Sequence, residues 1–240
     1  MRIDILTLFP EMCESVVKES IIGRALKSGA MDIRCHNIRD FAGNKHNRVD
    51  DTPYGGGMGM IMQANPIYEC YNSLLENDEH IHLIYMSPKG KTLTQKRAEE
   101  LSKLNRFVIL CGHYEGVDQR VIDEIVDEQI SIGDYVLTGG ELPALVLADT
   151  VCRMVKGVLP EDICFEEESH FSGLLEHPQY TKPYEWHGKT VPEVLMSGHH
   201  KNISEWKRIQ SLIETKKLRP DLFEKIELTD KDKKLIEELE

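Results

Sequence analysis

The run SIGDYVLTGGELP, from Ser131 to Pro143, constrains the fold more than any other part of the chain. Its first half is apolar and β-prone, and Glu141 opens a second apolar run with helical spacing. Gly139 and Gly140 stand between the two and permit backbone conformations that are closed to other residues. We therefore expect a strand, a glycine turn and a helix, with backbone amides and carbonyls left free to bind a ligand.

Two more predicted strands end in turn-forming sequences. RFVIL is followed by CGHYEGVD, from Cys111 to Asp118, and IHLIYMS is followed by Pro88, Lys89 and Gly90. In an open α/β sheet, ligands bind outside the carboxyl ends of the strands. Each of these loops alone fits an ordinary turn, but the three together predict one composite pocket.

The common nucleotide-binding motifs are missing. No G-x-G-x-x-G follows a predicted strand, and the glycine cluster from Tyr54 to Met60 lacks the Gly-Lys-Ser/Thr ending of a P-loop. Dinucleotides and nucleoside triphosphates are therefore disfavoured as ligands.

Strand-like and helical runs alternate through the larger part of the chain. We expect strands at 2–8, 31–38, 81–86, 106–111 and 128–137, and helices near 11–27, 66–75, 94–104, 118–126 and 141–155. This alternation predicts an α/β domain with a mostly parallel sheet and helices on both faces.

The alternation ends at Pro160. The sequence EDICFEEESHFSG that follows indicates a linker, and its polar, acidic composition predicts mobility. The remainder is predicted to be helical and polar. Asn202 and Glu205 are spaced as a capping box, and Thr229 is expected to cap a final helix.

Composition excludes a membrane protein. Hydrophobic residues make up 40% of the 240 residues, and the longest apolar runs are far too short to span a bilayer. The N-terminus MRIDILTLFPEM reads as a strand and a turn rather than a signal peptide. We expect a cytoplasmic protein.

The cysteines and histidines give no metal or redox motif. The six cysteines include no C-x-x-C pair, and Cys35, Cys70, Cys111 and Cys152 are interpreted as small buried apolar residues. The histidines at 170, 199 and 200 lack partners at ligand spacing. They are expected to be exposed or to contact RNA, and no metal site is predicted.

The charge is uneven along the chain. The formal net charge is −12, yet the stretch from Thr181 to Pro220 has eight basic residues against four acidic ones. Phosphate contacts normally come from Lys and Arg, so this stretch is a candidate for gripping nucleic acid. A solvated helix face is the alternative.

Seven ordered sequence blocks resemble the bacterial tRNA (guanine-N1) methyltransferases of the TrmD type, which belong to the SPOUT class. The resemblance covers essentially the whole chain. Its blocks are LFPEM at 8–12, VDDTPYGGGMGM at 49–60, YMSPKG at 85–90, GHYEGVD at 112–118, SIGDYVLTGGELPA at 131–144, GLLEHPQYTKP at 173–183 and VPEVLMSGHH at 191–200.

The resemblance implies a fold and an activity. It implies S-adenosylmethionine bound bent in a trefoil knot, a homodimer, and methylation of N1 of the guanosine just 3′ of the anticodon, position 37 of tRNA. No DNA or membrane partner is implied. The implied organisation is a catalytic domain at 1–160, a flexible linker at 161–172 and a helical tRNA-binding domain at 173–240. Nothing in periodicity or composition predicts a knot.

The implied chemistry needs a general base, because N1 of guanine carries a proton. A carboxylate is suited to this task. The position that matches the family's base is Glu168, where glutamate stands in place of the common aspartate, and Glu166 or Glu167 take the role if the register slips. As residues alone, these three glutamates would be a solvated charge run.

Two further residues are implied at the reaction centre. The guanidinium of Arg153 would offset the charge of the base or hold the guanine carbonyl. Without the resemblance, Arg153 is a surface helix residue. Glu115 would accept hydrogen bonds from the guanine edge that adenine cannot donate.

The resemblance also implies mostly main-chain contacts to S-adenosylmethionine. The implied cofactor residues are Tyr85, Met86, Ser87, Pro88, Gly112, Tyr114, Ser131, Ile132, Gly133, Tyr135, Leu137, Gly139, Gly140 and Pro143. Family members depend on Mg²⁺, but no ligand set for it is legible here. Asp50 and Asp51 are candidates for a substrate-loop or magnesium-related role, or for a turn cap.

The chain departs from the family pattern at two more positions. His113 stands where many relatives have arginine, and Gln179 replaces a common histidine. Two other functions remain open. One is a SPOUT methyltransferase that acts on ribosomal RNA or a ribose hydroxyl, and the other is a catalytically weak RNA-binding protein in which Glu168 marks lost activity.

Overall fold

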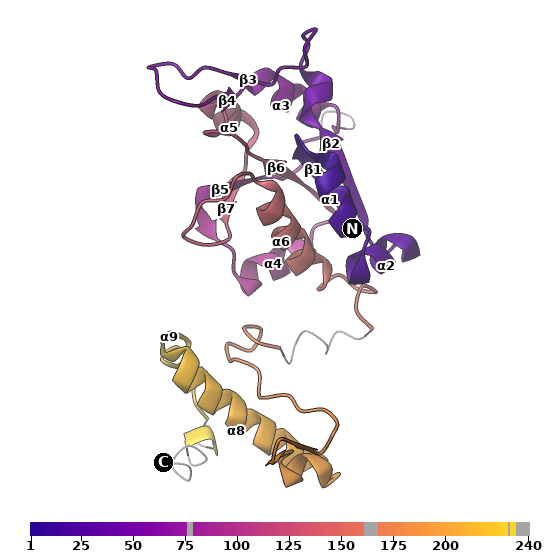
Figure 1. Ribbon diagram of the computed structural model, residues 1–240, viewed down its shortest axis with the longest axis vertical. Helices are drawn as coiled ribbons and strands as arrows, with labels where there is room; N and C mark the ends of the chain where they lie inside the picture. Colours follow the sequence, from indigo (N-terminus) through magenta and orange to yellow (C-terminus); the bar gives the residue numbers. More distant parts are fainter. Residues whose placement is uncertain (76–78, 161–167, 230, 234–240) are drawn as a thin grey trace. The chain divides into compact units, whose positions relative to one another are not determined.

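The computed structural model describes residues 1–75, 79–160, 168–229 and 231–233. The chain divides into two compact units, Met1–Asp162 and Ile163–Glu240. Each unit is considered by itself below (Figure 1).

A five-stranded parallel sheet forms the centre of the first unit, in the order β2-β1-β6-β5-β7. Its strands are β1 (Arg2–Thr7), β2 (Asp32–Asn37), β5 (Leu83–Thr92), β6 (Arg106–Cys111) and β7 (Glu128–Ser131). The prediction of an α/β fold with a parallel sheet is confirmed. A separate two-stranded ladder pairs β3 (Asp50–Asp51) with β4 (Ile61–Met62).

Side chains of the strands alternate between two hydrophobic cores, one on each face of the sheet. In β6, Phe107 and Ile109 enter one core, whereas Val108 and Leu110 enter the other. Both cores are closed by helices: α1 (Pro10–Val17), α2 (Ser20–Ser28), α4 (Gln95–Ser102) and α6 (Glu141–Cys152) contribute to the first, and α3 (Ala64–Asn72) and α5 (Gln119–Ile125) to the second. The short helix η1 (Ile38–Phe41) joins β2 to the loop that follows.

The strand predicted at 128–137 is wrong in its second half. β7 ends at Ser131, and Tyr135, Val136 and Leu137 are exposed in a loop. Gly133 has φ +151°, and the Tyr135 amide donates a hydrogen bond to the Gly133 carbonyl over 2.9 Å. This turn, which glycine permits, ends the strand despite the β-prone residues that follow.

The third predicted loop, at Ser87–Gly90, lies inside a strand. β5 continues to Thr92, and Ile130 of β7 pairs with both Met86 and Lys91. The intervening residues form a bulge. The bulge accommodates Pro88, which has no backbone N–H to donate to a regular strand pairing. The strand therefore does not end at Met86 as predicted, but is interrupted by this bulge, whose residues Ser87, Pro88 and Lys89 line the cavity described below.

The helix predicted at 11–27 is two helices. α1 ends at Val17 and α2 begins at Ser20, whose φ is +54°. A Cβ at Gly23 would lie 2.0 Å from the carbonyl oxygen of Lys18, so glycine allows the chain to fold back here. Helical periodicity alone did not reveal this break.

The second unit contains helices, as expected, but also a hairpin. Strands β8 (Glu185–Trp186) and β9 (Lys189–Thr190) are antiparallel, and η2 (Glu193–Met196), α8 (His200–Leu218) and α9 (Pro220–Phe223) follow. The capping box at Asn202 and Glu205 is wrong, because α8 begins before both residues. Thr229 does exchange hydrogen bonds with Asp232, each over 3.1 Å, as a helix cap does.

Cys70, Cys111 and Cys152 are buried as predicted, whereas Cys35 is only partly buried. Burial raises the pKa of Cys70 and of Cys152 to about 12, so both thiols stay protonated. None of the helices in the described residues has the length and apolar character needed to cross a membrane.

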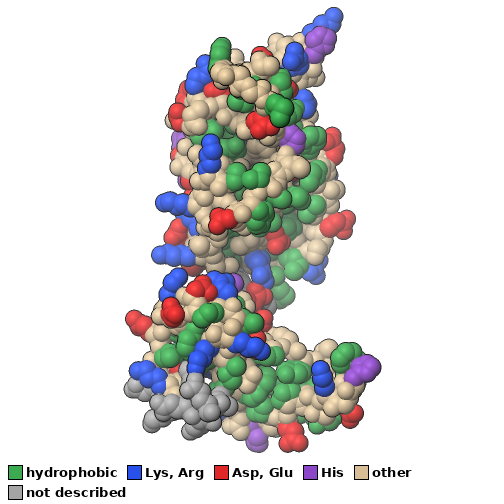
Figure 2. All heavy atoms as spheres, turned by 60° about the vertical axis from the view of Figure 1, so that its left-hand side comes forward, with side chains coloured by type: hydrophobic (Ala, Val, Ile, Leu, Met, Phe, Trp, Pro, Cys, Tyr) green, Lys and Arg blue, Asp and Glu red, His purple; other side chains and the backbone are tan. Residues whose placement is uncertain are grey.

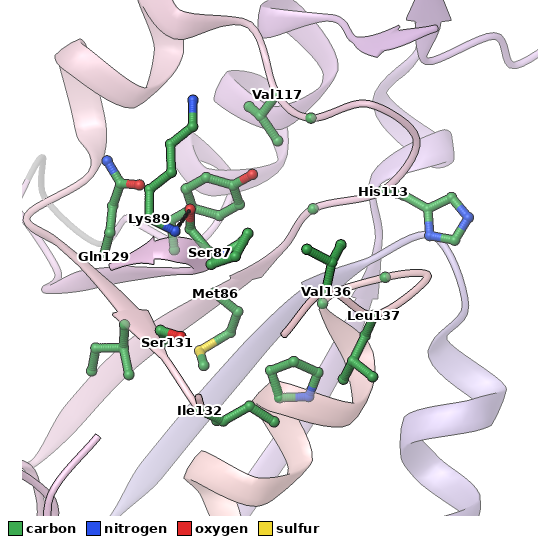
Figure 3. Close-up of a pocket in the computed structure, with 18 of the residues that line it drawn as sticks. Met86, Ser87, Lys89, His113, Val117, Gln129, Ser131, Ile132, Val136 and Leu137 are labelled. Carbon is green, nitrogen blue, oxygen red and sulfur yellow. Dashed lines mark hydrogen bonds between the residues drawn. The ribbon is translucent and has the colours of Figure 1, made fainter. Parts of the chain in front are cut away.

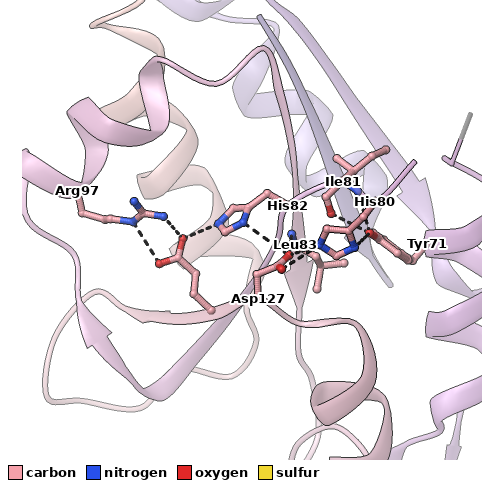
Figure 4. Close-up of polar contacts among 8 residues, drawn as sticks. Tyr71, His80, Ile81, His82, Leu83, Arg97 and Asp127 are labelled. Carbon is pink, nitrogen blue, oxygen red and sulfur yellow. Dashed lines mark hydrogen bonds and ion pairs between the residues drawn. The ribbon is translucent and has the colours of Figure 1, made fainter. Parts of the chain in front are cut away.

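Charged residues are tied together at the amino ends of the strands, opposite the predicted pocket. Asp4, fully buried, accepts hydrogen bonds from Arg2, Arg106 and His36. A second network runs through Arg97, Glu128, His82, Asp127 and His80 (Figure 4). The first network joins β1, β2 and β6, and the second joins α4 to the segment before β5 and to the start of β7. Both lie away from the cavity side of the sheet.

The Glu128 network generates a prediction about acid stability. Burial tends to raise the pKa of Glu128, but hydrogen bonds from His82 and Arg97 outweigh it and hold the pKa at about 2. Because its pKa is lowered, the ionised Glu128 carboxylate stabilises the fold when the pH is above the ordinary pKa of a glutamate. This contribution shrinks as the pH falls below that ordinary pKa and is lost as the pH falls through about 2. Glu128→Gln is expected to lower the free energy of unfolding at pH 7 by about 1–3 kcal/mol, measured by urea unfolding.

The difference between wild type and Glu128→Gln should narrow as the pH is lowered from 7 to 3. Glu124→Gln, which removes an exposed carboxylate from α5, is the matched control and should change stability by less than about 0.5 kcal/mol. A Glu128→Gln deficit that stays constant with pH would contradict the role of the charge.

Candidate functional site

A cavity of about 350 Å³ opens at the bulge in β5 and at the carboxyl ends of β6 and β7. In Figure 3, Lys89 and Gln129 line one side of it and Val136 and Leu137 the other. All the residues proposed from sequence to bind the cofactor line this cavity: Tyr85, Met86, Ser87, Pro88, Gly112, Tyr114, Ser131, Ile132, Gly133, Tyr135, Leu137, Gly139, Gly140 and Pro143. The three segments predicted to form one pocket therefore do meet.

The loop after β7 is held by its own hydrogen bonds. The Ser131 hydroxyl donates to the Gly133 carbonyl over 2.9 Å, and the Gly133 amide lies 3.1 Å from the same hydroxyl oxygen. A Cβ at Gly133 would lie 2.5 Å from the Tyr135 ring. The loop thus has a defined shape although its apolar side chains are exposed.

The loops after β6 and β7 meet through glycine backbone. The Gly140 amide donates to the Gly112 carbonyl over 2.8 Å, and His113 forms an isolated bridge with Gly139. A Cβ at Gly140 would lie 2.8 Å from the Cα of Cys111. Only glycine permits this approach, which closes the cavity on one side.

Tyr85 provides a polar group at the floor of the cavity. A Cβ at Gly112 would lie 2.8 Å from the Tyr85 hydroxyl, so glycine leaves room for the phenol. Burial raises the pKa of Tyr85, and the hydroxyl stays protonated at neutral pH. The cavity is thus lined mainly by backbone groups, apolar side chains and uncharged polar groups, with the charged side chains of Lys89 and Glu115 added to them.

Glu115 lies at the mouth of the cavity against the glycine cluster of residues 54–60. The Glu115 amide donates to the Met60 carbonyl over 3.0 Å. Gly59 has φ +86°, and a Cβ there would lie 2.4 Å from the Glu115 side chain. The sequence showed only that this glycine cluster is not a P-loop. In the structure, the cluster positions the carboxylate of Glu115.

Sequence reasoning missed a buried polar contact beside the cavity. The Thr7 hydroxyl donates to Glu141 over 2.8 Å, and both side chains are buried. His113 Nδ1 is buried, has no hydrogen-bond partner among the described residues, and lies 4.0 Å from the other Glu141 oxygen. Glu141 starts α6, where the partial positive charge of the helix terminus favours a carboxylate. No sequence signal linked residues so far apart.

The proposed catalytic residues belong to both units. Arg153 is the partly buried C-cap residue of α6 in the first unit. Glu168 is partly buried in the second unit. Glu166 and Glu167 lie outside the described residues.

Among the described residues, no group of three or more His, Cys, Asp and Glu side chains is arranged to hold a metal ion. His170, His199 and His200 are exposed, as expected. Asp50 and Asp51 lie in β3, where the Asp51 carboxylate accepts a hydrogen bond from the Thr52 amide over 2.8 Å, as in a turn cap.

Comparison with known proteins identifies the family. The sequence pattern of the family described as tRNA (Guanine-1)-methyltransferase TrmD matches residues 1–225. The chain belongs to this family. The tRNA (guanine-N(1)-)-methyltransferase of Ruminiclostridium cellulolyticum is 55% identical over 94% of this chain and 97% of its own length. Enzymes of the same name from Alkaliphilus oremlandii and Desulforamulus reducens are 54% and 52% identical over the whole of this chain.

The lining of the cavity agrees with what the resemblance to the TrmD family implied. TrmD-family enzymes use S-adenosylmethionine as methyl donor, and the cavity offers the main-chain groups and apolar side chains that the resemblance implied. Residues that line it but were not predicted include Ile61, Lys89, His113, Gln129, Val136 and Thr138. Most of these are sequence neighbours of predicted residues. The loop sequences as a whole, rather than single positions in them, could therefore have predicted these residues.

The Thr7–Glu141 contact generates a prediction. Thr7→Val leaves the buried Glu141 carboxylate without its hydroxyl donor, so the free energy of unfolding should fall by about 1–3 kcal/mol, measured by urea unfolding. The matched control is Thr150→Val, whose hydroxyl donates a hydrogen bond within its own helix, to the Val146 carbonyl. The control should lose at most about 0.5 kcal/mol. An equal decrease in the free energy of unfolding in the two variants would contradict a special contribution from the Thr7–Glu141 hydrogen bond.

Proposed function

We propose that the chain transfers a methyl group from S-adenosylmethionine to N1 of guanosine 37 in tRNA. The observation that carries this proposal is that two loops and a strand bulge of a parallel sheet together line one cavity in a chain of the TrmD family. Family membership supports the reaction, and the residues around the cavity support the roles proposed below.

The first unit fits the methyl donor. The cavity volume of about 350 Å³ is within the range of small-molecule sites. Ile132, Leu137 and Pro143 offer apolar surface for an adenine, and the glycine backbone of the loops offers amides and carbonyls for its polar edge. S-adenosylmethionine supplies a methyl group activated by a sulfonium.

Glu115 is proposed to select guanine. Its carboxylate can accept hydrogen bonds from the exocyclic amine of guanine, whereas adenine has no amine at that position to donate. Its position is braced by Gly59 and Met60. Discrimination follows because the exposed Glu115 carboxylate loses water when a base covers it, and this loss is costly unless that base donates a hydrogen bond.

Glu168 is proposed as the general base. Its carboxylate takes the N1 proton of guanine, and the nitrogen lone pair so released forms the bond to the methyl carbon. The bond between that carbon and the sulfonium sulfur breaks at the same time, its electron pair goes to the sulfur, and neutral S-adenosylhomocysteine leaves. Arg153 is proposed to stabilise the negative charge that develops on the guanine carbonyl. The Mg²⁺ dependence known in the family stays a prediction, and no step here involves a metal ion.

The second unit is proposed to hold the tRNA. Its basic stretch from Thr181 to Pro220 contrasts with the net charge of −12 of the whole chain, and basic side chains supply phosphate contacts. We retain the proposed division into a catalytic domain at 1–160, a linker at 161–172 and a tRNA-binding domain at 173–240. The linker falls largely outside the described residues.

A homodimer is also proposed. Exposed apolar side chains recur one turn apart on two helices that pack together, Met12 and Val16 on α1 and Leu142 and Val146 on α6. Such a surface is typical of a protein interface. The trefoil knot stays a prediction; the contact of Gly140 with Gly112, which brings the loop after β7 against the loop after β6, supports it.

Methyl transfer tests the proposed reaction and base. Labelled methyl transfer to a tRNA transcript with guanosine 37 should be robust for wild type and absent when that guanosine is replaced by adenosine. Glu168→Gln keeps the size of the side chain but cannot take a proton, so kcat should fall about 10²–10⁴-fold. S-adenosylmethionine affinity, measured by calorimetry, should be unchanged.

Glu166→Gln and Glu167→Gln are the matched controls and should keep kcat within about twofold. Loss in one of these instead of Glu168→Gln would move the base to that residue. RNA binding by wild type without any methyl transfer would favour the alternative of a catalytically weak RNA-binding protein. Methylation of ribose rather than of N1 would favour a different SPOUT activity.

Sedimentation velocity tests the homodimer. Val16→Glu with Val146→Glu places charge in the exposed apolar surface of α1 and α6, so the dimer should dissociate at micromolar concentration. Lys27→Glu, at the solvent-exposed end of α2, is the control and should sediment as wild type does. A wild-type monomer, or a charged variant that stays dimeric, would exclude this surface as the interface.

A further inference from the structure

The second unit carries a well-formed hairpin that was not predicted from sequence. β8 and β9 pair with Glu185 opposite Thr190 and Trp186 opposite Lys189. His187 and Gly188 form the turn, with φ +49° and +74°, as in the two-residue turns that match the twist of paired strands. The Val191 amide closes the base by donating to the Tyr184 carbonyl over 3.0 Å. We call residues 180–190 the aromatic hairpin.

Within the described part of the second unit, the aromatic hairpin covers no core. Every residue from 179 to 190 is exposed. Its three aromatic side chains remain largely in solvent, with exposed fractions of 48% for Tyr180, 45% for Tyr184 and 64% for Trp186. A lone two-stranded hairpin gains little stability by itself, so such a concentration of aromatic surface indicates a binding role rather than a structural one.

The hairpin is anchored at its start. Tyr180 and His177 lie against Trp206 of α8, with ring centroids 6.3 Å and 6.0 Å away. Trp206 therefore has a packing role, whereas Trp186 projects from the far end of the hairpin. The two tryptophans, the only ones in the sequence, occupy different environments.

The charge on the hairpin selects the kind of partner. Lys182 and Lys189 are basic and Glu185 is the one acidic residue of the segment. Residues opposite one another in a ladder share a face, so Trp186 and Lys189 point the same way, while Glu185 and Thr190 point the other. An aromatic ring beside a cation suits a base and its phosphate, and unpaired bases are what proteins read in RNA.

We propose that the aromatic hairpin binds unpaired nucleotides of the RNA substrate, with Trp186 stacking on a base and Lys189 contacting a phosphate. This rests on the proposed function only in taking the substrate to be an RNA with a single-stranded loop. The hairpin acts on substrate affinity and takes no part in the chemical step.

The tryptophans make the proposal directly measurable. In Trp206→Phe, an aromatic ring remains against His177 and Tyr180, and Trp186 becomes the single fluorescent reporter. Titration with an RNA stem-loop that carries the anticodon loop should quench its emission. A fully paired RNA duplex of the same length should quench it far less, because paired bases cannot stack on the ring.

Steady-state kinetics on tRNA provide the second readout. Trp186→Ala should raise KM about tenfold and leave kcat at saturating tRNA within about twofold, and Trp186→Phe should restore most of the affinity. Lys189→Ala should reduce the slope of log affinity against log salt by about 0.7, the value for one contact to single-stranded nucleic acid. Circular dichroism of each variant checks that the fold is intact.

Several results would overturn the proposal. An unchanged KM in Trp186→Ala, or equal quenching by duplex and stem-loop, would exclude base stacking. A change of Trp186 emission with protein concentration in the absence of RNA would show that a second copy of the chain covers the hairpin. Quenching by the stem-loop without methyl transfer would support the hairpin proposal while the proposed function fails, so the two outcomes are distinguishable.

Discussion

The close approach of Gly140 to Gly112 is the constraint on which the site depends. One backbone hydrogen bond of 2.8 Å joins the loop after β7 to the loop after β6, at a distance that no Cβ on Gly140 tolerates. α6 starts at the next residue and packs between β1, β6 and α1. The same contact therefore closes the cavity and directs the helix into the core. A side chain at this point would disturb binding and packing together.

The two ends of the parallel sheet have different tasks. At the carboxyl ends, glycine-rich loops expose backbone groups and small apolar surfaces to a cavity. At the amino ends, buried or partly buried carboxylates are tied to arginine and histidine, and hydrogen bonds hold the pKa of both Asp4 and Glu128 at about 2 against the opposing effect of burial. Stability from ionised groups is thereby kept away from the loops that must accommodate a ligand. This separation is common in α/β proteins, because loops at one edge can vary while the other edge supports the sheet.

The second unit uses a different kind of surface. The first unit presents side chains of both charges with hydrophobic groups between them, as Figure 2 shows for one face. In the second unit, the aromatic hairpin concentrates rings and lysines on two short paired strands, and α8 adds further basic residues. Aromatic rings give contact area at little cost in conformational entropy. A chain with a net charge of −12 can therefore bind a polyanion through a local surface, without a basic surface overall.

The sequence by itself determined the sheet, most helix positions and the residues around the cavity, because each depends on local chemistry. Alternating apolar residues specify strands such as 106–111, and glycine pairs specify where a loop approaches backbone closely. Only the tertiary structure decided the bulge at Ser87–Gly90, the break between α1 and α2, and the contact of Thr7 with Glu141, 134 residues apart. These features depend on what packs against a segment. The apolar residues Val136 and Leu137 predict a strand, but the turn at Gly133 ends the strand before them and they lie exposed in a loop. Local propensity is a fraction of a kcal/mol per residue and yields to packing.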